Sequence, residues 1–350
     1  MKNKKLFLAS VVGSLPRPKE LTKKILSTKN VFSNYINQQV KFVIAAQEKI
    51  GLDVITDGEW RRKSYVGVVE KIIDGLVCES NKDTGQTFHT VVKKIKYKNP
   101  GYFAREAKFL KQNTSKQIKI CLPSPYLLGE RLWNEEKSSK AYPKRKDFVE
   151  DIIKIFQKEI KLLENAGTDI VQIDDPHICL FVDKKTRALY KNPDKELEYA
   201  CQVINKTLEK TKKIKTALHL CRRNKGRCGW IGEGGYEYII PFINKINVNQ
   251  LVMEYSLPVA GDFKALEKLN KKFEIGLGCV DCRFEKIESP KVIVERVRKA
   301  LQYVDPQRIS LNPDCGFAPG SHVEIPLIEA INKLSNEVKA REILRKEYEK

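Results

Sequence analysis

The chain lacks the long apolar segments and the regular cysteine pairing that characterise membrane and disulfide-stabilised proteins. Its 350 residues contain no uninterrupted apolar run of about 18 residues, the length that a membrane-spanning helix needs. Nine cysteines, an odd number, are scattered through the chain. A chain of this length buries a sizeable core without disulfides. We therefore expect a reduced, cytoplasmic protein with no membrane partner.

A concentrated basic segment is also missing. The chain has 65 Lys and Arg against 44 Asp and Glu, a net charge of +21, which would suit a nucleic-acid-binding protein. However, the basic residues are spread over nearly every polar segment with acidic residues between them, as in KALEKLNKKFE (264–274). This pattern is typical of solvated helix faces, so nucleic acid is not among the partners that we expect.

The amino-terminal segment resembles a secretory signal only in outline. Lys2, Lys4 and Lys5 precede an apolar run of about eight residues, within the range of a signal peptide. That run passes straight into Gly13-Ser14-Leu15-Pro16, and the strand order below requires it as a strand. We therefore predict a first strand over 6–12 and no cleaved signal.

Short β-rich apolar segments alternate with helical patterns along the chain. The predicted strands are 6–12, 53–57, 118–123, 169–174, 214–221, 251–256, 274–281 and 308–314. The predicted helices are 34–50, 147–167, 194–211, 237–246, 262–271, 289–304 and about 324–348, with apolar residues at three- and four-residue steps. Eight strands alternating with helices predict an α/β fold, a (β/α)8 TIM barrel forming one domain over 1–350. Within 61–113, alternation and a glycine predict a β-hairpin-like insertion after strand 2.

Metal-binding side chains lie at the carboxyl ends of the predicted strands, where a barrel carries its active site. His219 and Cys221 end the fifth strand, and residues two apart in a strand point to the same face. Glu254 ends the sixth strand and Cys315 follows the eighth. Two thiolates, an imidazole and a carboxylate suit Zn²⁺, because sulfur ligands disfavour Mg²⁺ and Ca²⁺.

Each of these residues also has an ordinary explanation. A histidine and a cysteine at a strand end are often simply packed, and Cys315 alone would pass for a buried thiol. Cys279 and Cys282 form a CxxC pair, which elsewhere indicates a zinc or redox site. Within a strand, residues three apart face opposite ways, so we do not expect this pair to bind one ion.

Six motifs at the ends of successive predicted strands carry a family resemblance. In order they are VVGSLPRP (11–18), DGEW (57–60), VQIDDP (171–176), HLC (219–221), MEYS (253–256) and NPDCG (312–316). Together they resemble the catalytic C-terminal barrel of cobalamin-independent methionine synthase, over about residues 8 to 325. Stretches such as HLCRRN resemble the short, single-barrel members, a group that also includes epoxyalkane:coenzyme M transferases.

The resemblance implies a zinc-dependent methyltransferase that forms methionine by methyl transfer to the zinc-bound thiolate of homocysteine. The family's zinc ligands match His219, Cys221, Glu254 and Cys315, and its homocysteine-binding positions match Ser14, Glu59 and Asp174. The two carboxylates would hold the substrate ammonium, and Gly13 with Ser14 would hold its carboxylate. The alternative within the enzymes is alkyl transfer to another small thiol, such as coenzyme M.

Three departures from the family affect the methyl-donor side of the site. Cys121 and the residues after it stand where the family has a tryptophan, and Leu180 stands in place of a glutamate. Arg283 aligns with the family's proton-donating histidine, and arginine is a poor acid because its pKa is above about 12. His177 is a candidate substitute, so Asp174, Arg283 and His177 are the candidate catalytic residues. The expected donor is methyltetrahydrofolate or a methylated corrinoid, free or on a corrinoid protein.

Two further alternatives fall outside this enzyme class. A non-catalytic protein would use zinc only for structure, with a closed four-coordinate site, or would use its net charge of +21 to bind RNA. A relative of the uroporphyrinogen decarboxylase barrel would not need this metal set at all.

Overall fold

The computed structural model describes residues 5–80, 87–318 and 325–349. Seven parallel strands form one sheet in the order β1-β4-β5-β6-β7-β8-β9. Their bounds are β1 (Val54–Ile55), β4 (Gln117–Pro123), β5 (Ile170–Asp174), β6 (Lys215–Leu220), β7 (Gln250–Glu254), β8 (Glu274–Val280) and β9 (Ile309–Pro313). Between the two edge strands, Ala9 bridges to Leu311 and Ser10 to Val54, both in parallel. This segment closes the sheet into a barrel, which confirms the predicted fold.

The predicted first strand is irregular. Only isolated bridges form within 6–12, and Phe7 has a φ of 49°, in the left-handed region that interrupts a strand. Side chains add hydrogen-bond partners to this segment. The Ala9 amide donates to Asp53 Oδ2 at 3.0 Å. The Ser10 amide donates to Leu311 O at 3.1 Å and also lies 3.2 Å from Glu337 Oε1, on the last helix.

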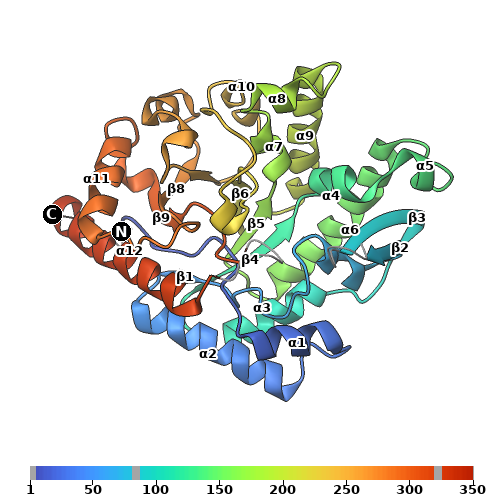
Figure 1. Ribbon diagram of the computed structural model, residues 1–350, viewed down its shortest axis with the longest axis horizontal. Coiled ribbons are helices and arrows are strands. Elements are labelled where there is room, and N and C mark those ends of the chain that lie inside the picture. The colour runs from blue at the N-terminus through green and yellow to red at the C-terminus, as the bar shows by residue number, and fades with distance from the viewer. Residues whose placement is uncertain (1–4, 81–86, 319–324, 350) are drawn as a thin grey trace.

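Helices connect the strands and surround the barrel (Figure 1). They are α1 (Lys19–Ser27), α2 (Asn34–Ile50), α3 (Tyr102–Gln112), α4 (Pro125–Leu132), α5 (Glu135–Ser138), α6 (Arg145–Asn165), α7 (Pro176–Leu180), α8 (Lys184–Arg187), α9 (Pro193–Leu208), α10 (Ile240–Ile243), α11 (Pro290–Leu301) and α12 (Leu327–Tyr348). The apolar periodicity predicted α2, α6, α9, α11 and α12 to within a few residues. After α6, Gly167 has a φ of 79° and its amide donates to Glu164 O at 3.1 Å, as in a glycine C-cap.

Two predicted helices are shorter than the sequence pattern indicated. Within 237–246 only α10 is α-helical, because Pro241 has no amide hydrogen and is accommodated only in the first turn. Within 262–271 the chain forms a 3-10 helix, η4 (Phe263–Lys268), whose first turn is capped by the Asp262 side chain. The other 3-10 helices are η1 (Gly67–Lys71), η2 (Gly226–Cys228), η3 (Pro258–Ala260) and η5 (Pro306–Arg308).

The insertion after β1 contains an antiparallel hairpin, β2 (Ile73–Ser80) and β3 (Thr87–Tyr97). Figure 1 shows it projecting beside α4 and α5, at the edge of the molecule. The register shifts next to Gly75, whose φ of 95° suits glycine. The predicted hairpin within 61–113 is therefore confirmed.

The barrel interior arranges polar side chains above an apolar layer. Val12, Val54, Ile170, Ala217 and Val252 form a small buried cluster of their own. Two residues further along three of these strands, on the same face, are Gln172, His219 and Glu254, all buried. The two-residue period of the strands thus brings these polar groups together at the carboxyl end of the barrel.

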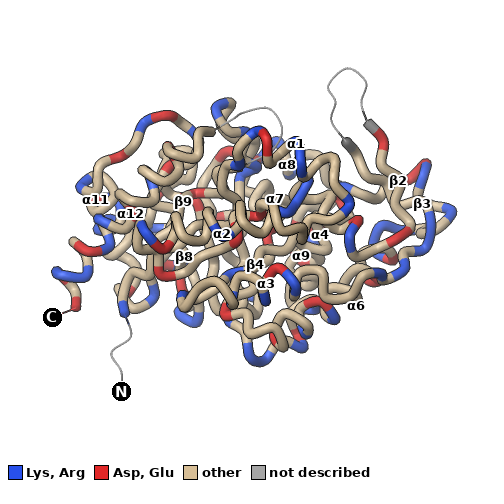
Figure 2. The backbone as a smooth tube through the Cα atoms, turned by 90° about the horizontal axis from the view of Figure 1, so that it is seen from below, with Lys and Arg blue, Asp and Glu red and all other residues tan. Residues whose placement is uncertain are grey.

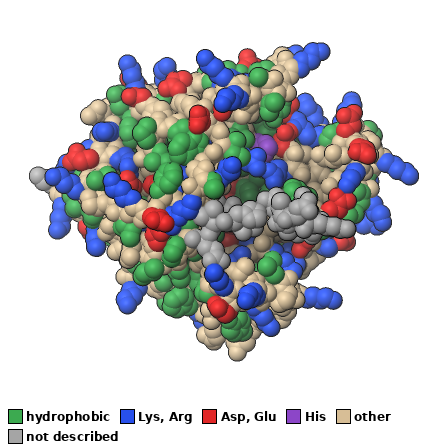
Figure 3. Space-filling view, viewed as in Figure 1, with side chains coloured by type: hydrophobic (Ala, Val, Ile, Leu, Met, Phe, Trp, Pro, Cys, Tyr) green, Lys and Arg blue, Asp and Glu red, His purple; other side chains and the backbone are tan. Residues whose placement is uncertain are grey.

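Charged residues are spread around the outside. Figure 2 shows Lys and Arg along most of the outer helices, with Asp and Glu between them, and Figure 3 shows the same mixture on one face. Among the described residues, no helix is long and apolar enough to cross a membrane.

Candidate metal centre and substrate site

Three of the four predicted metal ligands lie together. One ligand atom each from His219, Cys221 and Cys315 lies within 4.8 Å of the other two. His219 and Cys221 come from the end of β6, and Cys315 follows β9 across the barrel mouth. The two sulfurs are 3.3 Å apart, within hydrogen-bonding distance, and this bond lowers the pKa of the Cys221 thiol. This donor set suits a soft cation.

The His219 ring is oriented by a carboxylate. Its Nδ1 lies 3.3 Å from Asp174 Oδ1, and its Nε2 lies 3.4 Å from the Asp314 carbonyl oxygen. Burial disfavours a charged imidazole, but the hydrogen bond and the charge of Asp174 outweigh burial and raise the pKa of His219 to about 9. Loss of the Nε2 proton on metal binding would leave the Nε2 lone pair for the ion while Nδ1–H donates to Asp174, a common arrangement around ligating histidines.

The fourth predicted ligand is engaged elsewhere. Glu254 is 2% exposed, and the ligand atoms grouped at 4.8 Å among the described residues do not include its carboxylate. Its Oε1 accepts the Arg222 amide at 3.0 Å, and its Oε2 accepts Arg283 Nη2 at 2.7 Å. Ligation by Glu254 therefore stays a prediction.

The predicted substrate residues form a second group beside the first. Ligand atoms of Glu59, Cys121 and Asp174 also lie within 4.8 Å of one another. Glu59 follows Gly58 in a left-handed turn, with a φ of 58°, and its Oε1 lies 3.4 Å from Arg62 Nη1. Burial raises the pKa of Glu59 to about 7, although the charge of Arg62 opposes the shift. A further cation beside Glu59 would stabilise the charged form of this buried carboxylate.

Gly13 and Ser14 line the same region. A β-carbon at Gly13 would stand 2.7 Å from Glu59 Oε1 and 3.0 Å from Cys121 Sγ, so only glycine fits without displacement. The Ser14 hydroxyl accepts the Ala318 amide at 3.3 Å, and the Ser14 carbonyl accepts the Phe317 amide at 3.0 Å. The segment is thus fixed between the Glu59 carboxylate and the residues that follow Cys315.

The two candidate proton donors differ in their surroundings. Arg283 is 1% exposed and is bonded to Glu254 and to Asp314. His177, on α7, has a buried Nε2 with no hydrogen-bond partner among the described residues. Burial, with the charges of Arg223 and other arginines, lowers its pKa to about 3, so its imidazole is neutral at pH 7. Neither residue belongs to the two groups of candidate ligands found among the described residues.

Sequence reasoning missed two neighbours of Asp174. Gln172 Nε2 donates to Asp174 Oδ1 at 2.7 Å, and the hydroxyl of Tyr65, from the insertion, donates to the Asp174 carbonyl at 2.9 Å. A polar residue two positions before Asp174 was a usable signal for Gln172, whereas nothing in the sequence indicated Tyr65. Arg222, directly after Cys221, is buried, and its guanidinium donates to Tyr236 Oη at 2.8 Å and to Gly234 O at 2.7 Å.

Known proteins resemble the whole chain. The family described as "Cobalamin-independent synthase, Catalytic domain" matches residues 7–342. The chain belongs to this family. A methionine synthase of Pyrococcus horikoshii is 32% identical over 97% of this chain and 94% of its own length, and one of Saccharolobus solfataricus is 31% identical over 89% and 88%. Family membership confirms the resemblance and the enzyme class that it implied.

Solved structures support the fold. A B12-independent methionine synthase from Shewanella sp. W3-18-1, in complex with selenomethionine, superimposes with a TM-score of 0.78 at 23% identity, covering 98% of each chain. A methyltransferase from Methanosarcina mazei gives a TM-score of 0.58 at 15% identity. At identities of 23% and 15%, these superpositions show that the barrel fold is shared.

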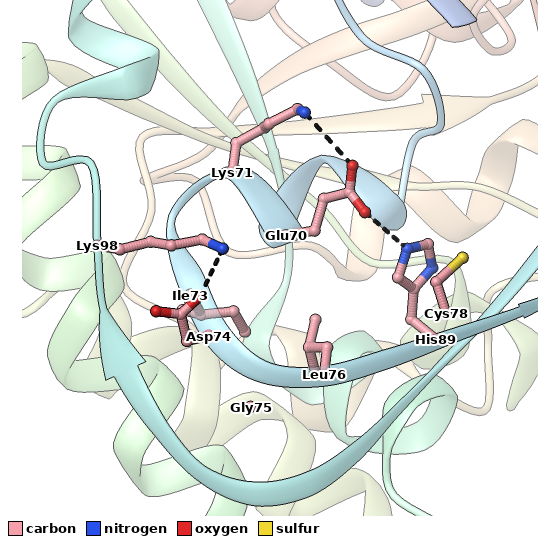
Figure 4. Close-up of a pocket in the computed structure, with 9 residues that line it drawn as sticks. All are labelled: Glu70, Lys71, Ile73, Asp74, Gly75, Leu76, Cys78, His89 and Lys98. Atoms are coloured by element: carbon pink, nitrogen blue, oxygen red, sulfur yellow. Dashed lines mark hydrogen bonds and ion pairs between the residues drawn. The ribbon is translucent and has the colours of Figure 1, made fainter. Parts of the chain in front are cut away.

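A separate cavity of about 280 Å³ lies at the base of the hairpin (Figure 4). There His89 Nε2 lies 3.1 Å from Glu70 Oε2, and this hydrogen bond is the main cause that lowers the pKa of Glu70 to about 2. Cys78, paired across the strands with His89, also lines it. The cavity shares no lining residue with the candidate site.

Proposed function

We propose that this chain transfers a methyl group to the thiol of homocysteine to form methionine, with Zn²⁺ held by His219, Cys221 and Cys315. The proximity of these three ligand atoms carries the proposal. One imidazole and two thiols fit zinc, and the Asp174 contact to Nδ1 directs His219 Nε2 to the ion. A bound Zn²⁺ lowers the pKa of a substrate thiol and so keeps it as the nucleophilic thiolate.

The chain's own residues bind the amino-acid end of the substrate. Glu59 and Asp174 receive the ammonium, and Gly13 and Ser14 receive the carboxylate. Asp174 acts on both parts of the site, because it also orients His219. The pair of carboxylates favours homocysteine over a thiol such as coenzyme M, which carries a sulfonate and no ammonium.

The methyl donor is methyltetrahydrofolate or a methylated corrinoid. Arg283 stays charged between two carboxylates, and His177 is neutral at pH 7, so neither is a ready proton source. This favours a donor whose departing group needs no proton, such as a methylated corrinoid, free or on a corrinoid protein. We further propose that residues 1–350 act as one barrel domain in the cytoplasm, where a reducing environment keeps the nine unpaired cysteines as thiols.

Turnover and metal content test the proposal together. Purified protein loaded with Zn²⁺ is assayed with homocysteine and either methyltetrahydrofolate, its polyglutamate or methylcobalamin. Cys315→Ala is expected to lose both the ion and the activity, whereas Cys78→Ala, an exposed thiol on the hairpin, keeps both. Methyl transfer by Cys315→Ala, or wild-type protein that binds no zinc, contradicts the proposal.

A further inference from the structure

A buried ion-pair network joins the strand ends around the metal centre. Arg283 lies between two carboxylates: its Nη2 is 2.7 Å from Glu254 Oε2, and its Nη1 is 3.2 Å from Asp314 Oδ2. All three side chains are at most 2% exposed. The network therefore links the ends of β7 and β9 through a residue that follows β8.

Asp314 fixes one end of this network. Its Oδ1 accepts the Tyr255 amide at 3.0 Å and the Ser256 amide at 2.9 Å, and its Oδ2 also accepts the Ser256 hydroxyl. Because Asp314 directly precedes Cys315, these bonds fix the backbone that carries one candidate ligand. The Tyr255 amide also donates to Gly278 O at 3.0 Å, but if Asp314 turned away from Arg283 the buried Ser256 amide would lose its hydrogen-bond partner.

Glu254 fixes the other end. Both of its oxygens accept hydrogen bonds, one from the Arg222 amide and one from Arg283. For the carboxylate to move to the metal, it would have to leave the guanidinium buried with a single acidic partner. Breaking a buried, hydrogen-bonded ion pair is strongly unfavourable.

We propose that Arg283 is a positioning residue that holds Glu254 outside the coordination shell, so that the ion has three protein ligands and a fourth position open to the substrate thiol. The inference rests on the proposed metal site. It departs from the four-ligand shell that the family resemblance implied, and it gives Arg283 a role other than proton transfer. The positive charge of Arg283 offsets one of the two negative charges of Glu254 and Asp314, and the thiolates of Cys221 and Cys315 would balance the two charges of the ion.

Metal affinity in a double-mutant cycle tests this role without measuring turnover. Zn²⁺ affinity is measured by competition with a chromophoric chelator for the wild type, Glu254→Gln, Arg283→Met and the double variant. In the wild-type background, Glu254→Gln is expected to weaken binding by no more than about tenfold, the lower end for residues outside the coordination shell. In the Arg283→Met background, Glu254 is released to the ion, and its replacement by Gln then costs ~100-fold or more.

A matched control removes a different ion pair. Arg296, on α11, is bonded to Glu288 at 2.6 Å, and Arg296→Met should leave the effect of Glu254→Gln unchanged. The inference is overturned if Glu254→Gln alone lowers Zn²⁺ affinity as much as Cys315→Ala does. It is also overturned if Glu254→Gln lowers Zn²⁺ affinity by the same factor with Arg283 and with Met at position 283.

A second measurement decides the matter if Arg283→Met does not fold. X-ray absorption of zinc-loaded wild type and Glu254→Gln should give the same set of protein ligands, and homocysteine should add a sulfur to both. A carboxylate scatterer lost in Glu254→Gln contradicts the inference while leaving the zinc site itself intact. Failure of the proposed function is distinct, because the wild type would then bind no zinc.

Discussion

Replacing Gly13 with alanine should impair recognition of the substrate ammonium while leaving the fold intact. The new β-carbon would stand 2.7 Å from Glu59 Oε1 and 3.0 Å from Cys121 Sγ, closer than side-chain atoms normally approach. Gly13 does not have a left-handed φ, so alanine causes no backbone strain there. The Glu59 carboxylate must move by several tenths of an ångström from its place beside Asp174.

The size of the effect follows from the bond that is lost. A hydrogen bond to a charged group contributes about 1.5–3 kcal/mol, which corresponds to a loss in kcat/KM of roughly 10- to 150-fold. Steady-state kinetics with homocysteine and with 4-mercaptobutanoate, which lacks the amino group, isolate the contribution of the bond between Glu59 and the ammonium to kcat/KM. We expect the loss with homocysteine and almost none with 4-mercaptobutanoate. Equal losses with both thiols, or unchanged kinetics with homocysteine, would refute the assignment of Glu59 to the ammonium.

Three further substitutions test other parts of the structure. Asp174→Asn should weaken zinc binding by roughly 10- to 100-fold, because it removes the charge beside His219 Nδ1; unchanged affinity in a chelator competition would contradict that role. Tyr65→Phe removes the 2.9 Å bond to the Asp174 carbonyl and should lower kcat/KM about fivefold, for a bond contributing about 1 kcal/mol. An unchanged kcat/KM would show that Tyr65 of the insertion does not contribute to the site. Burial raises the pKa of Glu337 from its ordinary value of 4.5 to about 8, so this group binds a proton more tightly in the folded state. Its stabilisation, present below pH 4.5, is lost as the pH rises through about 8. Thermal unfolding of the wild type should therefore show a decline between pH 5 and 8.5 that Glu337→Gln lacks, and parallel profiles would show that Glu337 does not titrate in this range.

The sequence was sufficient for the parts of the fold that depend on local patterns. Apolar runs located β1 and β4 to β9, and three- and four-residue steps located the long helices, because burial on one face requires those periods. The first strand was predicted as regular and is not, because Phe7 adopts a left-handed φ. The carboxylate of Asp53 accepts the Ala9 amide, and that of Glu337 shares the Ser10 amide with the Leu311 carbonyl. Those acceptors come from distant positions in the chain, which no local pattern reveals.

The same distinction holds within the site. His219 and Cys221 were predictable because a two-residue spacing at a strand end places both side chains on one face. The pairing of Arg283 with Glu254 and Asp314 depends on three strand ends meeting after the barrel has closed. Sequence alignment with the family gave Arg283 the position of an acid and Glu254 that of a ligand, but alignment cannot show that the two side chains bind each other.

The balance of buried charge explains why this barrel mouth would take up two cations. Glu59, Asp174, Glu254 and Asp314 are all wholly or largely buried there. The single charge of Arg283 is shared between Glu254 and Asp314, and that of Arg62 is shared between Glu59 and Glu106. Burying a carboxylate without a full partner is costly, and the raised pKa of Glu59, caused first by burial and opposed by Arg62, reflects that cost. The proposed substrate ammonium beside Glu59 and Asp174, and the proposed dication between His219 and the two cysteines, would supply positive charge that the two arginines do not.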